Sequence, residues 1–337
     1  MFEHRAPAPN YSIRLGAWSP RDETALAFPL RTATVAAMKT SLDHLPEGKR
    51  RELALVVRIL FEEFEAVTSR ASQQWKKSGR ILKVVLYGSY ARGGWVDDPV
   101  GGYRSDYDIV VVVSDERLTD VVDFWSVADD RLLRETSISN NLSTPVNFIV
   151  HSLADVNGQL ARGRPFFIDI VEHGVALYEA EGFSFATPRK LSPEAAKAEA
   201  QVHFDRWFAG ASEFLATARF TQGEGWKNRS AFLLHQATEQ LYHCVLLVLT
   251  LYSPKSHKLN FLRSQAEQIA PALIEAWPRE GKFERRGFEL LRQAYVNARY
   301  SPHYKISEKE LAWLIERVSL LRKLVEGVCW ERLSSEG

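Results

Sequence analysis

Two short runs of sequence, each where an apolar run meets a turn, decide the fold expected for this chain. They are Tyr87-Gly88-Ser89-Tyr90-Ala91-Arg92-Gly93-Gly94 and Ser105-Asp106-Tyr107-Asp108-Ile109. The first follows the apolar residues Ile81, Leu82 and 84–86, and the second leads into four valines at 110–113. We therefore predict one strand before Gly88 and a second strand that carries both aspartates. Side chains two apart in a strand share a face, so Asp106 and Asp108 should lie side by side.

Two adjacent carboxylates repel each other at neutral pH, and a divalent cation relieves that repulsion. Hard oxygen ligands suit Mg²⁺, which keeps several waters and binds the phosphates of a substrate. Gly88 lets the backbone approach a ligand closely, and Ser89 with the amides after it would open a short helix whose N-terminus favours phosphate oxygens. The pattern predicts a Mg²⁺ site at Asp106 and Asp108 beside a phosphate-binding turn.

The Gly-Ser turn, the Ala-Arg-Gly that follows it and Asp-x-Asp on a strand together resemble the minimal nucleotidyltransferase domain of the DNA polymerase β superfamily. The resemblance implies transfer of a nucleoside monophosphate from an NTP, most simply ATP, to a hydroxyl acceptor, with Mg²⁺ held by the aspartates. It implies catalytic roles for Asp106, Asp108 and Ser89, and nucleotide binding by Gly88, Ser89, Arg92 and Ser105.

Two features depart from that family pattern. Residues 92–104 make the gap between the turn and the aspartates longer than is usual, which predicts an extra loop over the site. The strand around residues 146–150 offers Asn147 where the family usually adds a third carboxylate. An amide can coordinate a metal through its oxygen, but it carries no charge and cannot act as a base. Asp169 is the first alternative ligand. A catalytically weak, nucleotide-binding regulatory protein of the toxin-antitoxin kind therefore stays open beside the enzyme.

Composition limits the remaining possibilities. The 337 residues suffice for two domains, and a net charge of +1 argues against binding nucleic acid mainly through bulk electrostatics. Cys244 and Cys329 have no metal-ligand spacing and are expected to be buried free thiols. The longest apolar run, residues 244–251, is shorter than a membrane span, and the N-terminus lacks a signal pattern. We expect no membrane contact and a cytoplasmic location.

Periodicity along the chain predicts an α+β protein of two domains. Residues 1–37 form an N-terminal arm without sustained periodicity, and 38–183 form an α/β nucleotidyltransferase fold with a small mixed sheet. Residues 184–192 form a linker, and 193–337 form an all-α bundle. Helices are expected at 46–75, 116–135 and 153–162, and in the bundle at 193–220, 228–252, 258–270, 280–299 and 308–333. Ser192 and a capping box of Ser307 and Glu310 mark two helix starts.

Three helical motifs in the second half are similar to the HEPN domain, a module named for nucleotide binding and often paired with minimal nucleotidyltransferases. They lie at residues 235–240, 256–259 and 294–300. The resemblance implies a HEPN site of Arg299, His303, Tyr304 and Glu239, an RNA or protein acceptor, and a homodimer through the helical domain. The helix at 228–252, apolar around most of its circumference, also favours burial on two sides.

A HEPN ribonuclease is a further alternative, since many HEPN domains cleave RNA with an Arg and a His four to six residues apart. Only three residues separate Arg299 from His303, and Pro302 breaks the helix between them. His235, Glu239 and His243 share one helix face but span about 12 Å, too far to meet one ion. They are interpreted as a polar stripe. The resemblance also implies that Tyr300 or Tyr304 could accept a nucleotide within the same chain.

Overall fold

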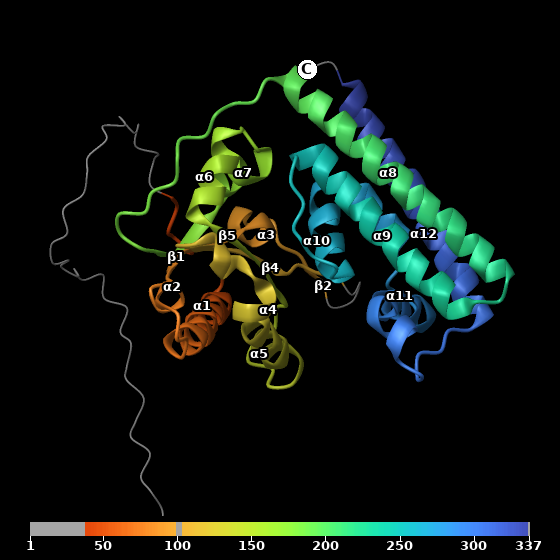
Figure 1. The fold of residues 1–337 in the computed structure, drawn as a ribbon, viewed down its shortest axis with the longest axis horizontal. Coiled ribbons are helices and arrows are strands. Elements are labelled where there is room, and N and C mark those ends of the chain that lie inside the picture. Colours follow the sequence, from red (N-terminus) through yellow and green to blue (C-terminus); the bar gives the residue numbers. More distant parts are fainter. Residues whose placement is uncertain (1–37, 99–102, 336–337) are drawn as a thin grey trace, which may run out of the picture. The chain divides into compact units, whose positions relative to one another are not determined.

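The computed structural model describes residues 38–98 and 103–335, and the expected arm at 1–37 lies outside the described residues. The described residues fall within one compact unit. A small sheet with its helices is followed by a helical bundle, so the chain is an α+β protein (Figure 1).

The sheet has four strands in the order β5-β4-β1-β6. They are β1 (Ile81–Tyr87), β4 (Tyr107–Val113), β5 (Val146–Ser152) and β6 (Val175–Glu179). Strand β1 is antiparallel to β4 and β6, whereas β4 and β5 are parallel, so the predicted mixed sheet is present. Every residue of β1 and β4 is buried. The register places Asp108 between Tyr87 and Asn147 on the two neighbouring strands.

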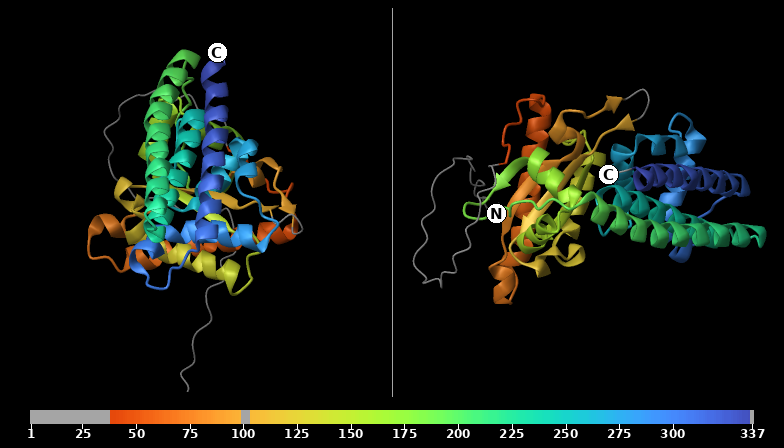
Figure 2. Two further views of the ribbon diagram at one scale, coloured as in Figure 1. Left: turned by 90° about the vertical axis from the view of Figure 1, so that its right-hand side faces the viewer. Right: turned by 90° about the horizontal axis from the view of Figure 1, so that it is seen from above.

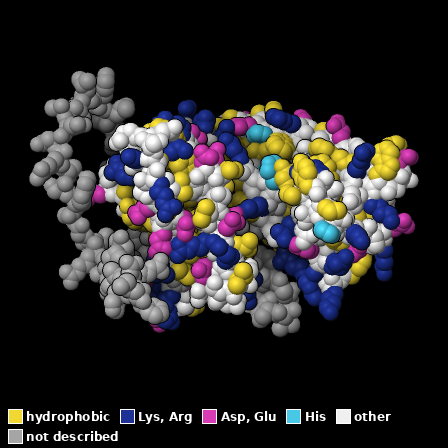
Figure 3. All heavy atoms as spheres, turned by 60° about the horizontal axis from the view of Figure 1, so that its bottom comes forward, with side chains coloured by type: hydrophobic (Ala, Val, Ile, Leu, Met, Phe, Trp, Pro, Cys, Tyr) yellow, Lys and Arg dark blue, Asp and Glu magenta, His cyan; other side chains and the backbone are white. Residues whose placement is uncertain are grey.

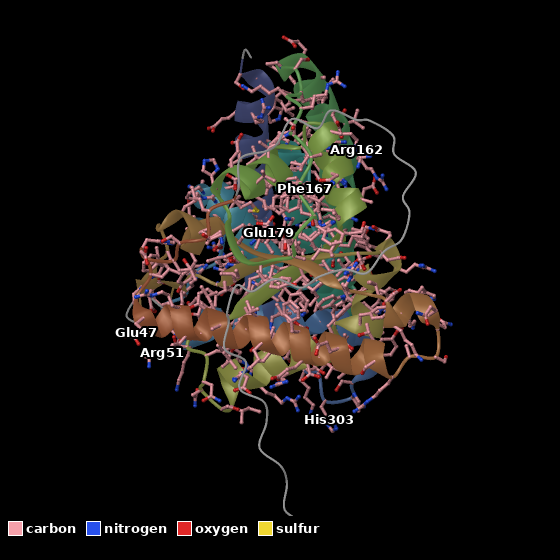
Figure 4. All side chains as sticks on the ribbon, turned by 90° about the vertical axis from the view of Figure 1, so that its left-hand side faces the viewer. Glu47, Arg51, Arg162, Phe167, Glu179 and His303 are labelled. Atoms are coloured by element: carbon pink, nitrogen blue, oxygen red, sulfur yellow. The ribbon has the colours of Figure 1, made fainter. Side chains whose placement is uncertain are left out.

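Helices cover both faces of this sheet (Figure 2). Ile109, Val111 and Val113 pack with α1 (Glu47–Ser69), α4 (Val121–Phe124) and α5 (Ser126–Ser137). Val110 and Val112 pack with α6 (Leu153–Ala161) and α7 (Pro165–His173), where Phe167 lies in the interior (Figure 4). Side chains alternate along a strand, so Asp108 shares the second face with Val110.

The local structure differs from the expected elements in several places. Residues 116–135 form three short helices instead of one, η1 (Glu116–Thr119), α4 and α5, because Asp115 and Asp120 each cap a new helical start. Helix α1 ends at Ser69, and α2 (Gln74–Lys77) follows. Helix α7 and a two-stranded hairpin of β2 (Asp97–Asp98) and β3 (Tyr103–Arg104) were not expected. The hairpin flanks residues 99–102, which the structure leaves undescribed.

The bundle contains the expected helices within a few residues. Its elements are α8 (Pro193–Gly223), α9 (Lys227–Thr250), α10 (Leu259–Ile269), η2 (Pro271–Ala276), α11 (Lys282–Tyr300) and α12 (Glu308–Ser334). Ser192 caps α8 by accepting from the Ala195 amide at 3.2 Å, and both hydrogen bonds of the Ser307–Glu310 capping box are present. Helix α9 packs against α8, α10, α11 and α12 of its own chain. Contacts within the chain thus cover the apolar circumference that suggested a dimer, and the homodimer stays a prediction.

Other whole-chain expectations can be compared with the described residues. Cys244 and Cys329 are both buried and free. None of the described helices is long and apolar enough to cross a membrane. Figure 3 shows basic, acidic and hydrophobic side chains interspersed over one face, in keeping with the near-zero net charge.

Candidate functional site

The two aspartates lie at the start of β4, in the middle of the sheet. Asp108 belongs to the strand, whereas Asp106 lies one residue before it. The side chain of Asp108 is fully buried. Asn147 of the parallel strand β5 donates a hydrogen bond from Nδ2 to Oδ2 of Asp106, at 2.9 Å. The amide in the expected position of a third carboxylate therefore contacts the aspartate pair directly.

The Gly-Ser turn lies against the same carboxylates. Gly88 follows β1, has a φ of +72°, and begins the short helix α3 (Gly88–Arg92). A Cβ atom at Gly88 would lie 2.6 Å from Oδ2 of Asp108, closer than two such atoms can approach. A glycine is therefore needed both for the positive φ and for the close approach to Asp108. The Ser89 hydroxyl is buried and has no hydrogen-bond partner among the described residues.

Helix α10 of the bundle closes over Asp108, which the sequence did not indicate. Gln265 donates from Nε2 to Oδ1 of Asp108 at 2.7 Å, and Gln268 donates from Nε2 to Oδ2 at 2.8 Å. The Tyr87 hydroxyl donates in turn to Oε1 of Gln265 at 3.1 Å. Gln265 and Gln268 are three residues apart and so share a helix face. This spacing could have indicated from the sequence that the two glutamines lie on one helix face. It does not indicate which part of the protein that face packs against.

Burial changes the acidity of both aspartates. It raises the pKa of Asp108 to about 8, with the nearby Asp106 adding to the rise and the bonds from Gln268 and Gln265 opposing it. Burial also raises the pKa of Asp106 to about 6, while the hydrogen bond from Asn147 and the nearby Ser264 lower it. Low dielectric disfavours the charged form of a carboxyl group. Burial thus favours the protonated form of both carboxyl groups.

Three further residues predicted from the sequence lie around this pair. Arg92 donates from Nη1 to Oδ2 of Asp169 at 2.7 Å, and Asp169 also contacts His173. Asp169, which was predicted as the alternative third metal ligand, therefore forms an ion pair with Arg92. The Ser105 hydroxyl accepts a hydrogen bond from the Val96 amide at 3.0 Å, which links the two ends of the β2–β3 hairpin. Within 38–98 and 103–335 no group of three or more His, Cys, Asp or Glu side chains is placed to hold a metal ion.

The predicted HEPN residues separate into different environments. Arg299 lies in the last turn of α11, donates from Nε to the Tyr295 carbonyl at 2.6 Å, and stacks on the Tyr295 ring. His303 follows the helix end and is exposed at the margin of the molecule (Figure 4). Tyr304 is buried, and its hydroxyl donates to the Leu290 carbonyl at 2.9 Å. None of the contacts found among described residues joins Arg299 to His303.

Glu239 instead forms a cluster with two other histidines. Its Oε1 lies 2.9 Å from Nδ1 of His257, and its Oε2 lies 3.7 Å from Nδ1 of His235. Burial raises the pKa of Glu239 and lowers the pKa of His235 to about 4, so His235 is neutral at pH 7. The rings of His257 and His235 both contact Tyr295, with centroids 5.0 and 5.2 Å away. His257 was part of a recognised motif but was not predicted as a site residue.

The helical bundle carrying this cluster defines the class of this half of the chain. Residues 204–328, from within α8 to within α12, match the family model of the HEPN domain. The match confirms the HEPN resemblance for that region. A search of curated proteins found no match to the chain.

Proposed function

We propose that the chain is a Mg²⁺-dependent nucleotidyltransferase that acts on an NTP and is coupled to a nucleotide- or RNA-related HEPN domain. One observation carries the proposal: a glycine turn with positive φ approaches the buried carboxyl group of Asp108 so closely that a Cβ at Gly88 would lie 2.6 Å from its Oδ2. A structural turn needs the positive φ but has no need of carboxylates beside it. The buried hydroxyl of Ser89, the residue after Gly88, has no hydrogen-bond partner within 38–98 and 103–335, which supports a site for a polar ligand.

The donor set fits a magnesium ion. Mg²⁺ commonly uses only one or two protein carboxylates and completes its shell with water and substrate phosphates. Asp106 and Asp108 would hold it, and the ion would neutralise charge that develops on the transferred phosphoryl group. Burial raises the pKa of both carboxyls, because a low-dielectric environment disfavours their charged forms.

The side chains of this site would position the nucleotide and stabilise its charge, and none of them would form a covalent bond to it. Gly88 leaves space for phosphate oxygens, the Ser89 hydroxyl can donate to one of them, and Arg92 can offset their charge once released from Asp169. Asn147 orients Asp106 through its hydrogen bond. The acceptor would be a hydroxyl group, whose oxygen would bond to the α-phosphorus as pyrophosphate leaves and its proton passes to water. If it is a tyrosine of this chain, Tyr300, with 74% of its surface exposed, is accessible, whereas Tyr304 is buried.

A nucleotide-binding regulator without significant turnover is the second candidate. Asn147 favours it, because a neutral amide occupies the expected place of a third carboxylate and binds Asp106 directly. The two candidates make the same prediction for binding and opposite predictions for transfer. A ribonuclease at Arg299 and His303 has less support, because the structure does not bring these side chains together.

Calorimetry with ATP, GTP, CTP and UTP, with and without Mg²⁺, tests the proposal. The double variant Asp106→Asn/Asp108→Asn should lose Mg²⁺-dependent binding and remain folded, because it removes two buried carboxyl groups without changing their shape. Glu310→Gln, in the capping box of α12, is the control for a buried acid elsewhere. Equal Mg²⁺-dependent affinity in wild type and double variant would disprove the site.

Transfer is tested by intact mass after incubation with ATP and Mg²⁺. An added nucleoside monophosphate that is lost in Tyr300→Phe would identify both the activity and its acceptor. Asn147→Asp restores one negative charge beside the pair, and it should increase transfer if weak metal binding limits the reaction. Binding without transfer in either protein would favour the regulatory candidate.

A further inference from the structure

Helix α10 occupies the space that the proposed reaction needs. Both carboxylate oxygens of Asp108 accept hydrogen bonds from uncharged amides of this helix, those of Gln265 and Gln268. A metal ligand must offer an oxygen lone pair to the ion, and these amides already use one lone pair on each oxygen. Asp108 has no solvent-exposed surface, so an ion cannot reach it from solvent while α10 is in place.

The same helix fills the space beside the glycine turn. Oε1 of Gln268 lies 3.0 Å from the position that a Cβ would have on Gly88. Phosphates bound at the turn would have to occupy that space. Ser264, one turn before Gln268, lies close enough to Asp106 to lower its pKa. Side chains on one face of α10 therefore contact the turn and both aspartates.

Specific contacts hold α10 in this position. Phe261 of α10 is buried in the same hydrophobic cluster as Val85 and Val110 of the sheet. Gln265 bridges Asp108 and the Tyr87 hydroxyl, and Lys258, just before the helix, pairs with Asp129 of α5. The closed arrangement is thus a packed contact of apolar, polar and charged groups, with Gln265 and Gln268 directed at one carboxylate.

We propose that α10 is an intramolecular cap on the candidate nucleotidyltransferase site, and that a nucleoside triphosphate with its divalent cation binds by displacing Gln265 and Gln268 from Asp108. The inference rests on the proposed function and adds its regulation. Nucleotide binding then selects an open form of the chain, and its apparent affinity is reduced by the fraction of molecules that are closed. Because α10 belongs to the HEPN-matching region, nucleotide binding and the state of that region are coupled.

The test compares wild type with Gln265→Ala/Gln268→Ala. A non-hydrolysable ATP analogue with a methylene group between the α- and β-phosphorus atoms, plus Mg²⁺, is the probe. Two lost hydrogen bonds to Asp108 should favour the open form and tighten binding by about 10-fold or more. Gln201→Ala, which removes a glutamine paired with Asp205 on α8, is the matched control and should bind like wild type.

Hydrogen exchange supplies a second measurement that does not depend on the variants. In wild-type protein, the analogue with Mg²⁺ should increase exchange across residues 259–269, whereas ligand binding alone usually slows exchange near a site. Tighter binding in the double variant together with faster exchange in α10 supports the cap. Two results would contradict the proposed cap and leave the nucleotidyltransferase proposal standing. One is that wild type binds the analogue without faster exchange in α10. The other is that the double variant binds the analogue no more tightly than wild type. Binding by neither protein overturns both.

Discussion

Gly88 is the residue on which the proposed site depends most directly. Alanine would have to adopt a φ of +72° and place its Cβ 2.6 Å from Oδ2 of Asp108. We expect Gly88→Ala to lower the free energy of unfolding by about 2–4 kcal/mol, from backbone strain and from displacement of a buried carboxyl group. Urea denaturation measures the change.

Gly182 is the matched control for this substitution. Its φ is +86°, but a Cβ there would have no atom within 4 Å. Gly182→Ala should lower the free energy of unfolding by only about 1 kcal/mol, from backbone strain alone. Equal losses at the two positions would show that the contact with Asp108 does not constrain Gly88.

His243 should make stability depend on pH. It is buried on α9, its Nδ1 lies 2.6 Å from the Ser253 hydroxyl, and burial lowers its pKa to about 4. Because the folded pKa lies below the unfolded value of about 6.5, the unfolded chain binds more protons between these values. Stability should therefore fall as pH drops from about 6.5 to 4, by up to about 3 kcal/mol from this residue.

Urea denaturation between pH 4 and 7 tests this contribution. His243→Gln cannot titrate, so its free energy of unfolding should fall less steeply with decreasing pH than that of wild type. Ser334→Ala changes an exposed side chain that does not titrate and should leave the slope unchanged. Parallel pH profiles for wild type and His243→Gln would contradict the prediction.

At the level of the elements, caps explain where several helices begin. The start of α12 has the full capping box, with Glu310 N donating to the Ser307 hydroxyl at 3.2 Å and Ser307 N donating to Oε2 of Glu310 at 2.8 Å. Ser307→Ala should lower the free energy of unfolding by about 1 kcal/mol, because one helix-terminal amide loses its acceptor. Thermal unfolding measures the loss.

The other end of the same helix provides the control. Ser334 is exposed in the last turn of α12, where alanine is the better helix former. Ser334→Ala should therefore be neutral or slightly stabilising. Similar losses for Ser307→Ala and Ser334→Ala would mean that the capping box does not contribute to stability.

At the level of the whole described chain, a small set of aromatic side chains joins the bundle to the sheet. The Tyr252 ring stacks on Phe166 of α7, with centroids 4.1 Å apart, and its hydroxyl lies 2.8 Å from Nε2 of His151. Phe261 is buried in the sheet's cluster. Most of the remaining bundle core is a separate hydrophobic cluster. Cooperative unfolding of both parts therefore depends on these contacts.

Calorimetry can measure that cooperativity. Wild type should unfold in one transition, whereas Tyr252→Ala/Phe261→Ala, which removes about 3–5 kcal/mol per aromatic side chain, should unfold in two. Phe208→Ala removes an aromatic side chain from the bundle core alone and should lower the melting temperature without splitting the transition. A single transition in the double variant would show that other contacts couple the two parts.

The sequence by itself determined the features that depend on local periodicity and local chemistry. Short, nearly continuous apolar runs ending at residue 86 and beginning at residue 109 defined two strands of the sheet, and helical spacing after residue 193 defined the bundle. The Gly88-Ser89 turn and the aspartates were recognisable because a left-handed turn and paired carboxylates each need particular residue types. The capping box was recognisable for the same reason, since both of its hydrogen bonds are made within four residues.

Only the tertiary structure decided which surfaces meet. The face of α10 that carries Gln265 and Gln268 is polar in the sequence, and nothing in its spacing distinguishes solvent from Asp108, 157 residues earlier in the chain. Likewise, Tyr304 is buried because the chain after α11 packs back against that helix. Glu239 contacts His257 because the chain before α10 returns to α9. Such contacts depend on the packing of whole elements, because hydrophobic burial selects the arrangement and the polar groups inside it must then find partners.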